Sequence, residues 1–280
     1  MITNVGSGML GASWRWLNQT WRRFATGLCF VVFGLGGLVM SLTALPLLKL
    51  RAYGDPARQQ QMAKQMVQKT FRFFIGLMRA TGVFNFDFPA RQQLQNCRGQ
   101  VIIANHPSLI DIVALISFVP NADCVVKAHL WHNPFMRGVI KSSGYISNGD
   151  PDGLITDCQR SLAQGNNLII FPEGTRTGPG HAFKFQRGPA NLALRTNSDL
   201  VALRVACDPV TLIKNEPWYC APKQKPTLTI GYLRLVEIAP YQDDTASIAA
   251  RKLTRDLESY YNKVLESNGN FKTRTENADH

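Results

Sequence analysis

The chain has 280 residues, of which 45% are hydrophobic and 18% charged, and its formal net charge at pH 7 is +12. This length and hydrophobic content suffice for one sizeable folded domain and exclude a disordered or fibrous chain. The six cysteines are scattered without paired spacing, which argues against a disulfide framework or a zinc site and favours reduced thiols.

The positive charge is concentrated in the N-terminal part of the chain. Residues 1–100 contain twelve Lys and Arg residues but only two acidic residues, Asp55 and Asp87, whereas the remainder is nearly balanced. Such a basic segment predicts an anionic partner, which is either nucleic acid or an anionic lipid surface.

An uncharged apolar segment at residues 24–48 favours the lipid surface over nucleic acid. A helix of this length can cross a hydrocarbon core of about 30 Å. Tryptophans and arginines precede it, as at a membrane interface. They are Trp14, Arg15, Trp16, Trp21, Arg22 and Arg23. The segment is too long for a secretory signal, and no cleavage site follows it.

Three arrangements of this segment remain open from the sequence: a full membrane span, a re-entrant helix and a buried core helix. The absence of polar positions argues against the core helix. Glycines and a proline within the segment favour a re-entrant or half-inserted helix. They are Gly27, Gly34, Gly36, Gly37 and Pro46.

A second helix is predicted at residues 57–80, after a turn at Gly54, Asp55 and Pro56. Its second half is rich in large apolar residues flanked by Arg72 and Arg79. This half could lie in the membrane interface or pack on the folded domain. Residues 1–81 are therefore interpreted as a helical hairpin for membrane attachment.

Residues 82–268 show short apolar segments that alternate with helical ones, which predicts an α/β domain. Strands are expected at residues 101–104, 124–127, 144–147, 168–171, 200–206 and 228–236. Helices are expected at residues 109–118, 133–142, 154–164, 189–195 and 245–266. The fold class is thus α/β, with a mixed, mostly parallel sheet flanked by helices. Residues 269–280 are expected to form a disordered tail.

The first chemical motif is Asn105-His106-Pro107-Ser108-Leu109-Ile110-Asp111, which follows a predicted strand. A histidine held by a carboxylate can remove a proton from an alcohol near neutral pH. Pro107 suits the first position of the next helix, and the turn before it could bring Asp111 beneath the imidazole. The alternative is a histidine that caps a helix and an aspartate on its exposed side.

The second motif is Phe171-Pro172-Glu173-Gly174-Thr175-Arg176-Thr177, which also follows a predicted strand. Gly174 permits a tight turn, and the planar guanidinium of Arg176 suits a phosphate. Glu173 could orient this arginine or bind a substrate hydroxyl. A structural pair between Glu173 and Arg176 is the alternative. Downstream, Lys184 and Arg187 place two more cations before a predicted helix.

In this order and spacing, the two motifs resemble those of the glycerolipid acyltransferase family, whose best-known members are 1-acyl-glycerol-3-phosphate acyltransferases. The resemblance covers residues 101–209. It implies that His106 is the general base and Asp111 its partner. It also implies that Glu173, Gly174, Thr175 and Arg176 form the loop that binds the acceptor. Lys127, in a segment similar to the family's intermediate motif, is a candidate to stabilise the oxyanion.

The resemblance further implies transfer of a fatty acyl group to a lysophospholipid at a membrane. The donor would be a thioester of coenzyme A or acyl carrier protein, and no metal or other cofactor is expected. Lys127, Lys184 and Arg187 are candidate phosphate contacts. The implied location is a membrane, the cytoplasmic membrane in a bacterium, with the catalytic domain facing the cytoplasm. Nucleic acid is not expected as a partner.

Two positions depart from the family pattern. Asn148 lies where the family usually has an arginine that helps to hold the acceptor phosphate, and Leu203 lies in a strand that usually contains a proline. Two alternatives therefore stay open. One is an acyltransferase for a different lipid or a secondary-metabolite acceptor, and the other is a catalytically silent membrane scaffold of the same fold.

Overall fold

The N-terminal apolar segment forms one long helical rod in the computed structural model, which describes residues 5–178 and 180–267. It comprises α1 (Val5–Val39), a π-helical turn at Met40–Ala44 and α2 (Leu45–Arg51). The hydroxyls of Ser41 and Thr43 donate to the carbonyls of Gly37 and Val39, and Pro46 lacks an N–H. The π-helical turn therefore accommodates Pro46, which has no backbone N–H to donate, and the helix continues across it.

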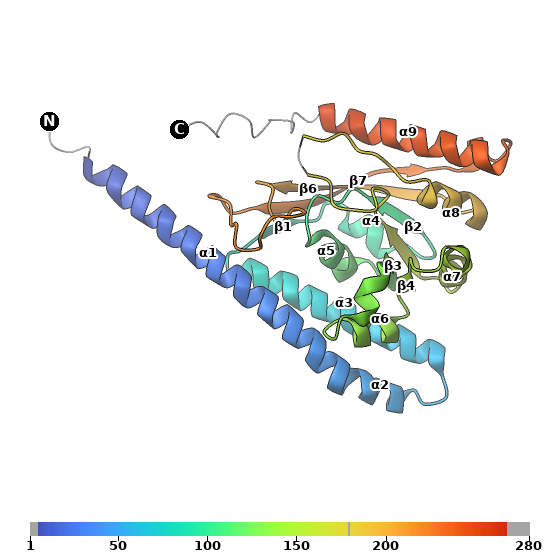
Figure 1. Ribbon diagram of the computed structural model, residues 1–280, viewed down its shortest axis with the longest axis horizontal. Coiled ribbons are helices and arrows are strands. Elements are labelled where there is room, and N and C mark those ends of the chain that lie inside the picture. The colour runs from blue at the N-terminus through green and yellow to red at the C-terminus, as the bar shows by residue number, and fades with distance from the viewer. Residues whose placement is uncertain (1–4, 179, 268–280) are drawn as a thin grey trace.

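The described residues show the predicted pairing of helices, and its role in membrane attachment stays a prediction. After Arg51 the chain turns through Gly54, which has a φ of +84°, and α3 (Pro56–Ala80) returns along α1 (Figure 1). The carboxylate of Asp55 caps α3 by accepting the N–H of Arg58 at 2.9 Å.

One face of α3 is buried against the α/β domain, so of the two alternatives the packed helix is the one observed. Its buried residues recur at helical spacing. They are Ala63, Lys64, Val67, Phe71, Phe74, Ile75 and Met78. Arg72 and Arg79 donate to the carbonyls of Ser117 and Phe86, at 3.3 and 2.7 Å. These two hydrogen bonds help to hold α3 to the domain.

The rest of the described chain forms a seven-stranded sheet in the order β1-β7-β6-β2-β5-β3-β4. The strands are β1 (Asn85–Asp87), β2 (Val101–Ala104), β3 (Ala122–Val126), β4 (Ile146–Ser147), β5 (Asn167–Ile170), β6 (Leu200–Asp208) and β7 (Thr227–Val236). From β4 to β6 the neighbouring strands pair in parallel, whereas β7 pairs antiparallel with β6. The predicted mixed, mostly parallel sheet is thus confirmed, and β1 is a strand that the sequence did not indicate.

The helices of this part are α4 (Arg91–Gln95), α5 (Asp111–Phe118), α6 (Arg137–Ser143), α7 (Pro151–Ala163), α8 (Gly188–Thr196) and α9 (Ala246–Ser267). Short 3-10 turns occur at η2 (Ala128–His132) and η3 (Ala239–Tyr241). All five helices predicted for the domain exist. The first and second begin later than expected, at Asp111 and Arg137. The expected tail at residues 269–280 lies outside the described residues.

The helices cover both faces of the sheet (Figure 1). Alternate residues of β2 point to opposite sides, so Ile102 joins a core with α3 and α5, whereas Val101 and Ile103 join a core with α8 and α9. Because β3, β5, β2 and β6 are parallel, their carboxyl ends share one edge of the sheet. Loops at such an edge are the usual place for a ligand site in α/β folds.

Candidate active site

The loop after β2 places His106 and Asp111 at the carboxyl edge of the sheet. The helix that follows begins at Asp111, with Ile110 at its N-cap, so the expectation that Pro107 opens this helix is wrong. Residues 105–110 instead form a loop long enough to fold back over the helix N-terminus. Asp111 therefore meets the imidazole from the first turn of α5, where the helix dipole stabilises a negative charge.

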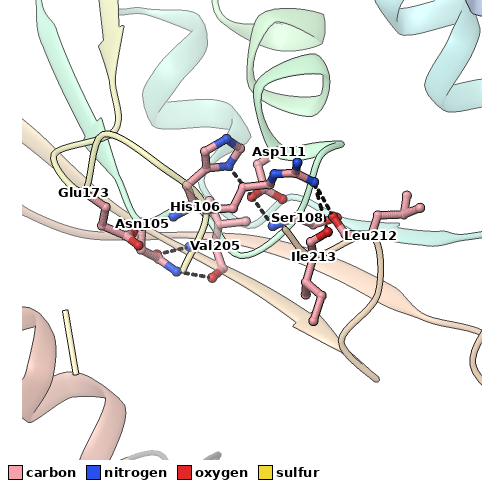
Figure 2. A network of polar contacts seen from close by, with 9 residues as sticks. Asn105, His106, Ser108, Asp111, Glu173, Val205, Leu212 and Ile213 are labelled. Carbon is pink, nitrogen blue, oxygen red and sulfur yellow. Dashed lines mark hydrogen bonds and ion pairs between the residues drawn. The ribbon is translucent and has the colours of Figure 1, made fainter. Parts of the chain in front are cut away.

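His106 and Asp111 form a hydrogen-bonded pair. Nδ1 of His106 lies 2.9 Å from Oδ2 of Asp111, and the same oxygen accepts the backbone N–H of Ser108 at 2.7 Å (Figure 2). The Asp111 side chain is fully buried, whereas 17% of the His106 side chain is exposed. The carboxylate is thus shielded from water while the imidazole remains reachable. The alternative of an exposed aspartate is excluded.

The charge of Asp111 depends on its partners. Burial raises the pKa of Asp111, while the imidazole of His106, the N–H of Ser108 and the nearby charge of Arg176 favour the ionised form and oppose that rise. A cationic imidazole would stabilise the ionised carboxylate of Asp111 by electrostatic attraction. The pair is therefore arranged to stabilise the state in which His106 has taken up a proton.

The imidazole is held in orientation by a ring contact. It stacks on Phe171, with ring centroids 4.1 Å apart and an angle of 16° between the planes. With Nδ1 directed to Asp111, Nε2 is the ring nitrogen left for a substrate, and it has no hydrogen bond to any residue that the structure describes. This arrangement fixes the tautomer that carries a proton on Nδ1.

Asn105 anchors the base of the loop, a role that the sequence did not reveal. Its side chain lies between β2 and β6. Nδ2 of Asn105 donates to the carbonyl of Val205 at 2.7 Å, and Oδ1 of Asn105 accepts the N–H of Val205 at 2.8 Å (Figure 2). Asn105 is buried. The two bonds continue the sheet pairing one residue beyond β2, so His106 begins from a fixed position. An asparagine directly after a strand was the available signal.

The second motif clamps the backbone of His106. Oε1 of Glu173 accepts the N–H of His106 at 2.8 Å, and the carbonyl of His106 accepts the N–H of Thr177 at 3.1 Å. Gly174, with a φ of +67°, provides the turn that carries the loop past His106. Thr175 lies half-buried within this turn. The structure thus brings the two motifs together at one point.

Glu173 is held in an unusual electrostatic state. It is 6% exposed, its Oε2 has no partner among the described residues, and burial together with the charge of Asp111 raises the pKa of Glu173 to about 7. The N–H of His106 opposes that rise. Glu173 is therefore poised between its neutral and charged forms near neutral pH.

Arg176 does not pair with Glu173, so both the orienting role and the structural pair predicted for these two side chains are wrong. Nη1 of Arg176 donates to the carbonyls of Leu212 and Ile213, at 2.8 and 3.2 Å. Leu212 in turn accepts the N–H of Leu109 through the same carbonyl, at 3.2 Å. Arg176 is thus a positioning group for the loop after β6, and its other nitrogens remain available to an anion.

Lys127 lies at the same sheet edge, directly after β3, and its side chain is exposed. The segment that follows it is capped by Asn148, whose Oδ1 accepts the N–H of Ala128 at 2.9 Å. Asn148 also donates its own N–H to the carbonyl of Val126 at 3.0 Å. Asn148, where the resemblance led us to expect an arginine, therefore closes the turn behind Lys127.

The remaining predicted cations lie apart from this network. Lys184 and Arg187 are exposed on the segment before α8, and Arg187 is the N-cap of that helix, as its position in the sequence indicated. No contact within the described residues joins either side chain to His106 or Asp111. Within the same residues, no group of His, Cys, Asp or Glu side chains is arranged to hold a metal ion.

Comparisons with known proteins find similar acyltransferases. Residues 85–211 match the family model named Acyltransferase. A 1-acyl-sn-glycerol-3-phosphate acyltransferase of Helicobacter pylori is 34% identical over 101 residues, which is 34% of this chain and 43% of that protein. The human 1-acyl-sn-glycerol-3-phosphate acyltransferase beta is 26% identical over 182 residues, which is 62% of this chain and 59% of that protein. The chain spans about half the length of the curated relatives it matches.

A solved structure has the same fold. The crystal structure of the 1-acyl-sn-glycerophosphate (LPA) acyltransferase PlsC from Thermotoga maritima matches with a TM-score of 0.64 at 18% identity. The match covers 88% of this chain and 98% of that one. The chain is therefore similar to 1-acyl-sn-glycerol-3-phosphate acyltransferases, it matches the Acyltransferase family model over residues 85–211, and it shares the fold of the solved structure.

Proposed function

We propose that this protein is a membrane-attached O-acyltransferase that transfers a fatty acyl group from a thioester to the hydroxyl of 1-acyl-glycerol-3-phosphate. The observation that carries the proposal is the pair of His106 and Asp111, with Nδ1 and Oδ2 2.9 Å apart and the imidazole partly exposed. The names of the similar proteins supply the acceptor.

The chemistry follows from this pair. Nε2 of His106 takes the proton of the acceptor hydroxyl as its oxygen attacks the thioester carbonyl. The tetrahedral intermediate then breaks its carbon–sulfur bond, and the imidazolium returns the proton to the departing thiolate. Asp111 holds the Nδ1 proton and stabilises the imidazolium between these steps. No acyl-enzyme is formed, and no metal takes part in the scheme.

The cations at the sheet edge supply the polar contacts for substrate. Arg176 would bind the acceptor phosphate through the guanidinium nitrogens that the loop carbonyls do not engage. Lys127, exposed at the end of β3, would approach the oxyanion or the same phosphate. Glu173 and Gly174 would act on the acceptor indirectly, because they fix the backbone on which His106 lies.

The N-terminal helix would attach the enzyme to the membrane. Residues Trp16–Arg51 form a helix long and apolar enough to cross a bilayer by length and composition. Large apolar side chains recur on its outer face at helical spacing. The exposed ones are Leu17, Trp21, Phe24, Leu28, Val31, Leu35, Val39 and Leu42.

The opposite face of this helix is covered by protein, which favours a helix that lies in the membrane surface over a full span. A side chain at Gly27 would collide with Trp218, and one at Gly37 would collide with the carbonyl of Phe135. Arg22 is also turned inward, where Nη2 donates to the carbonyls of Pro222 and Lys223. The apolar face alone would then enter one leaflet, on the cytoplasmic side where the thioester donors are made.

A different phosphorylated or hydroxylated lipid is the second candidate acceptor. It is favoured by Asn148, whose side chain caps the turn after Lys127 and brings no charge to the acceptor. A site without a cation at this position would discriminate less strongly in favour of a phosphate.

Purified protein in phospholipid vesicles, supplied with a labelled acyl thioester and a panel of lysolipids, tests both candidates. Formation of phosphatidic acid from 1-acyl-glycerol-3-phosphate, above the rates for neutral and zwitterionic lysolipids, supports the first. Faster acylation of another lysolipid supports the second. Acylation of none of them, by protein that is folded and bound to vesicles, contradicts the proposal as a whole.

A further inference from the structure

A concave site that does not include His106 lies between α2, α3 and α6. It is a cleft of about 290 Å3. None of its lining residues belongs to either catalytic motif. They are Leu45, Leu48, Lys49, Pro56, Gln59, Gln60, Ala63, Lys141, Ser142 and Gly144.

The polar groups of this cleft suit an anion. Lys49 on α2 and Lys141 on α6 bring two positive charges to it from different helices, and no carboxylate is among its lining residues. Gln60 and Ser142 add an amide and a hydroxyl. The first turn of α3, which begins at Pro56, also forms part of the wall.

The shape of the cleft depends on Gly144. This residue has a φ of +68°, and a side chain on it would collide with the amide of Gln60. Gln60 is only partly buried, and its amide packs over the glycine at the edge of the cleft. The wall is therefore defined by packing as well as by charge.

The surroundings of the cleft point to a lipid as the source of the anion. Leu45 and Leu48 line it beside the lysines, and Leu47, Leu50 and Tyr53 are exposed on the neighbouring part of the rod. An apolar surface next to two cations suits a phospholipid, because its phosphate can contact the lysines while its acyl chains contact the leucines. Free phosphate would make no favourable contact with the leucines.

We propose that this cleft binds the headgroup phosphate of an anionic phospholipid and so fixes the protein's orientation on the membrane. The lysines hold the phosphate, and the acyl chains run along the leucines of α2. The site is separate from the acceptor site, and the assignment of a lipid source rests on the membrane placement of α1 and α2 proposed above.

The test has two variants that act by different means. Lys49→Gln with Lys141→Gln removes the charges, and Ser142→Trp fills the cleft with no change of charge. The matched control is Lys252→Gln with Lys263→Gln, which removes two exposed lysines from α9 on the far side of the sheet (Figure 1). Thermal unfolding identifies the folded variants.

Binding is measured to phosphatidylcholine vesicles with and without phosphatidylglycerol, and to short-chain phosphatidylglycerol and inorganic phosphate in solution. The charge variant is expected to lose roughly tenfold in affinity for the anionic vesicles, and the control less than about twofold. The Ser142→Trp variant is expected to lose binding of short-chain phosphatidylglycerol. Neutral vesicles should bind all variants alike.

Three results would overturn the proposal. Equal losses of affinity for anionic vesicles in the charge variant and the α9 control would show that net charge, and not the cleft, determines the binding. Unchanged lipid binding by Ser142→Trp would exclude the cleft. Inorganic phosphate that binds as tightly as short-chain phosphatidylglycerol would assign the site to free phosphate. Failure of wild-type protein to bind neutral vesicles would instead contradict the proposed membrane placement, and the titrations in solution would still test the cleft.

Discussion

Oε1 of Glu173 accepts the backbone N–H of His106 at 2.8 Å, which joins two motifs that lie 67 residues apart in the sequence. The contact explains why both motifs follow neighbouring parallel strands, β2 and β5. The glutamate does not act on a substrate through this bond. It fixes the start of the loop on which the histidine and its aspartate lie.

The raised pKa of Glu173 predicts a pH-dependent stability. Its pKa is about 7 in the folded protein and 4.5 in the absence of burial, so between these values only the folded state holds the proton. The free energy of unfolding should therefore fall as the pH rises from about 4.5 to about 7, by up to about 3 kcal/mol. Urea unfolding of wild type and Glu173→Gln across this range measures it.

The Glu173→Gln variant isolates this group, because its amide oxygen can still accept the N–H of His106 but cannot titrate. The stability of wild type relative to the variant should decline with pH. A difference that stays constant from acidic to neutral pH would contradict the assignment. Glu173→Ala, which leaves the N–H without a partner, should cost about 1–3 kcal/mol at every pH.

Substitution of Arg176 should affect acceptor binding and the loop after β6 together. Arg176→Ala removes two hydrogen bonds to the carbonyls of Leu212 and Ile213, and also the cation proposed to hold phosphate. The KM for 1-acyl-glycerol-3-phosphate should rise roughly tenfold, with a smaller change for an unphosphorylated acceptor. Steady-state kinetics with both acceptors measures this split.

Arg195→Ala, at an exposed position on α8, serves as the control for loss of an arginine. Its kinetics should match those of wild type. An unchanged KM of the Arg176→Ala variant for the phosphorylated acceptor would show that the guanidinium only supports the loop.

A buried ion pair holds α3 to the sheet, and breaking it should destabilise the protein. Nζ of Lys64 lies 2.8 Å from Oδ2 of Asp123, and both side chains are buried. Burial raises the pKa of Asp123 and lowers that of Lys64, while each charge stabilises the other. Lys64→Met should therefore cost roughly 3–5 kcal/mol, because it leaves an uncompensated buried carboxylate.

The double variant Lys64→Met with Asp123→Asn removes both charges and should recover part of that loss. Lys69→Met, at an exposed position of the same helix, should have little effect. Chemical unfolding of the three variants measures the differences. A double variant no more stable than Lys64→Met would show that repacking, not the lone charge, causes the loss.

Much of the fold could be predicted because local pattern and tertiary structure agree. The apolar runs of β2 and β5 are strands buried on both faces, and the helical spacing within α9 matches its observed span. The strand β1 was missed because its three residues carry no pattern of their own and are paired only by β7. The start of α5 was missed because Pro107 resembles a helix-opening residue whatever the tertiary context.

The site was predictable in its residues but less so in its contacts. The turn at Pro107 allowed a pair of His106 and Asp111, the family resemblance implied it, and the structure brings the two side chains together. The partners of Glu173 and Arg176 could not be predicted, because both are backbone groups that any residue could supply. The roles of Asn105 and Asn148 could not be predicted from the sequence for the same reason, because both side chains form hydrogen bonds with main-chain atoms.

The central claim is that His106 is the base that deprotonates the acceptor. The most direct measurement is the rate of acyl transfer from a labelled thioester by purified His106→Ala in vesicles. His132→Ala, at an exposed position of η2, provides the matched control. Thermal unfolding and vesicle binding of both variants are measured beside the rate, so that only folded, vesicle-bound protein is compared.

The account predicts that His106→Ala lowers the rate by roughly 10²- to 10⁴-fold, while His132→Ala remains active. Substantial transfer by folded, vesicle-bound His106→Ala would contradict it.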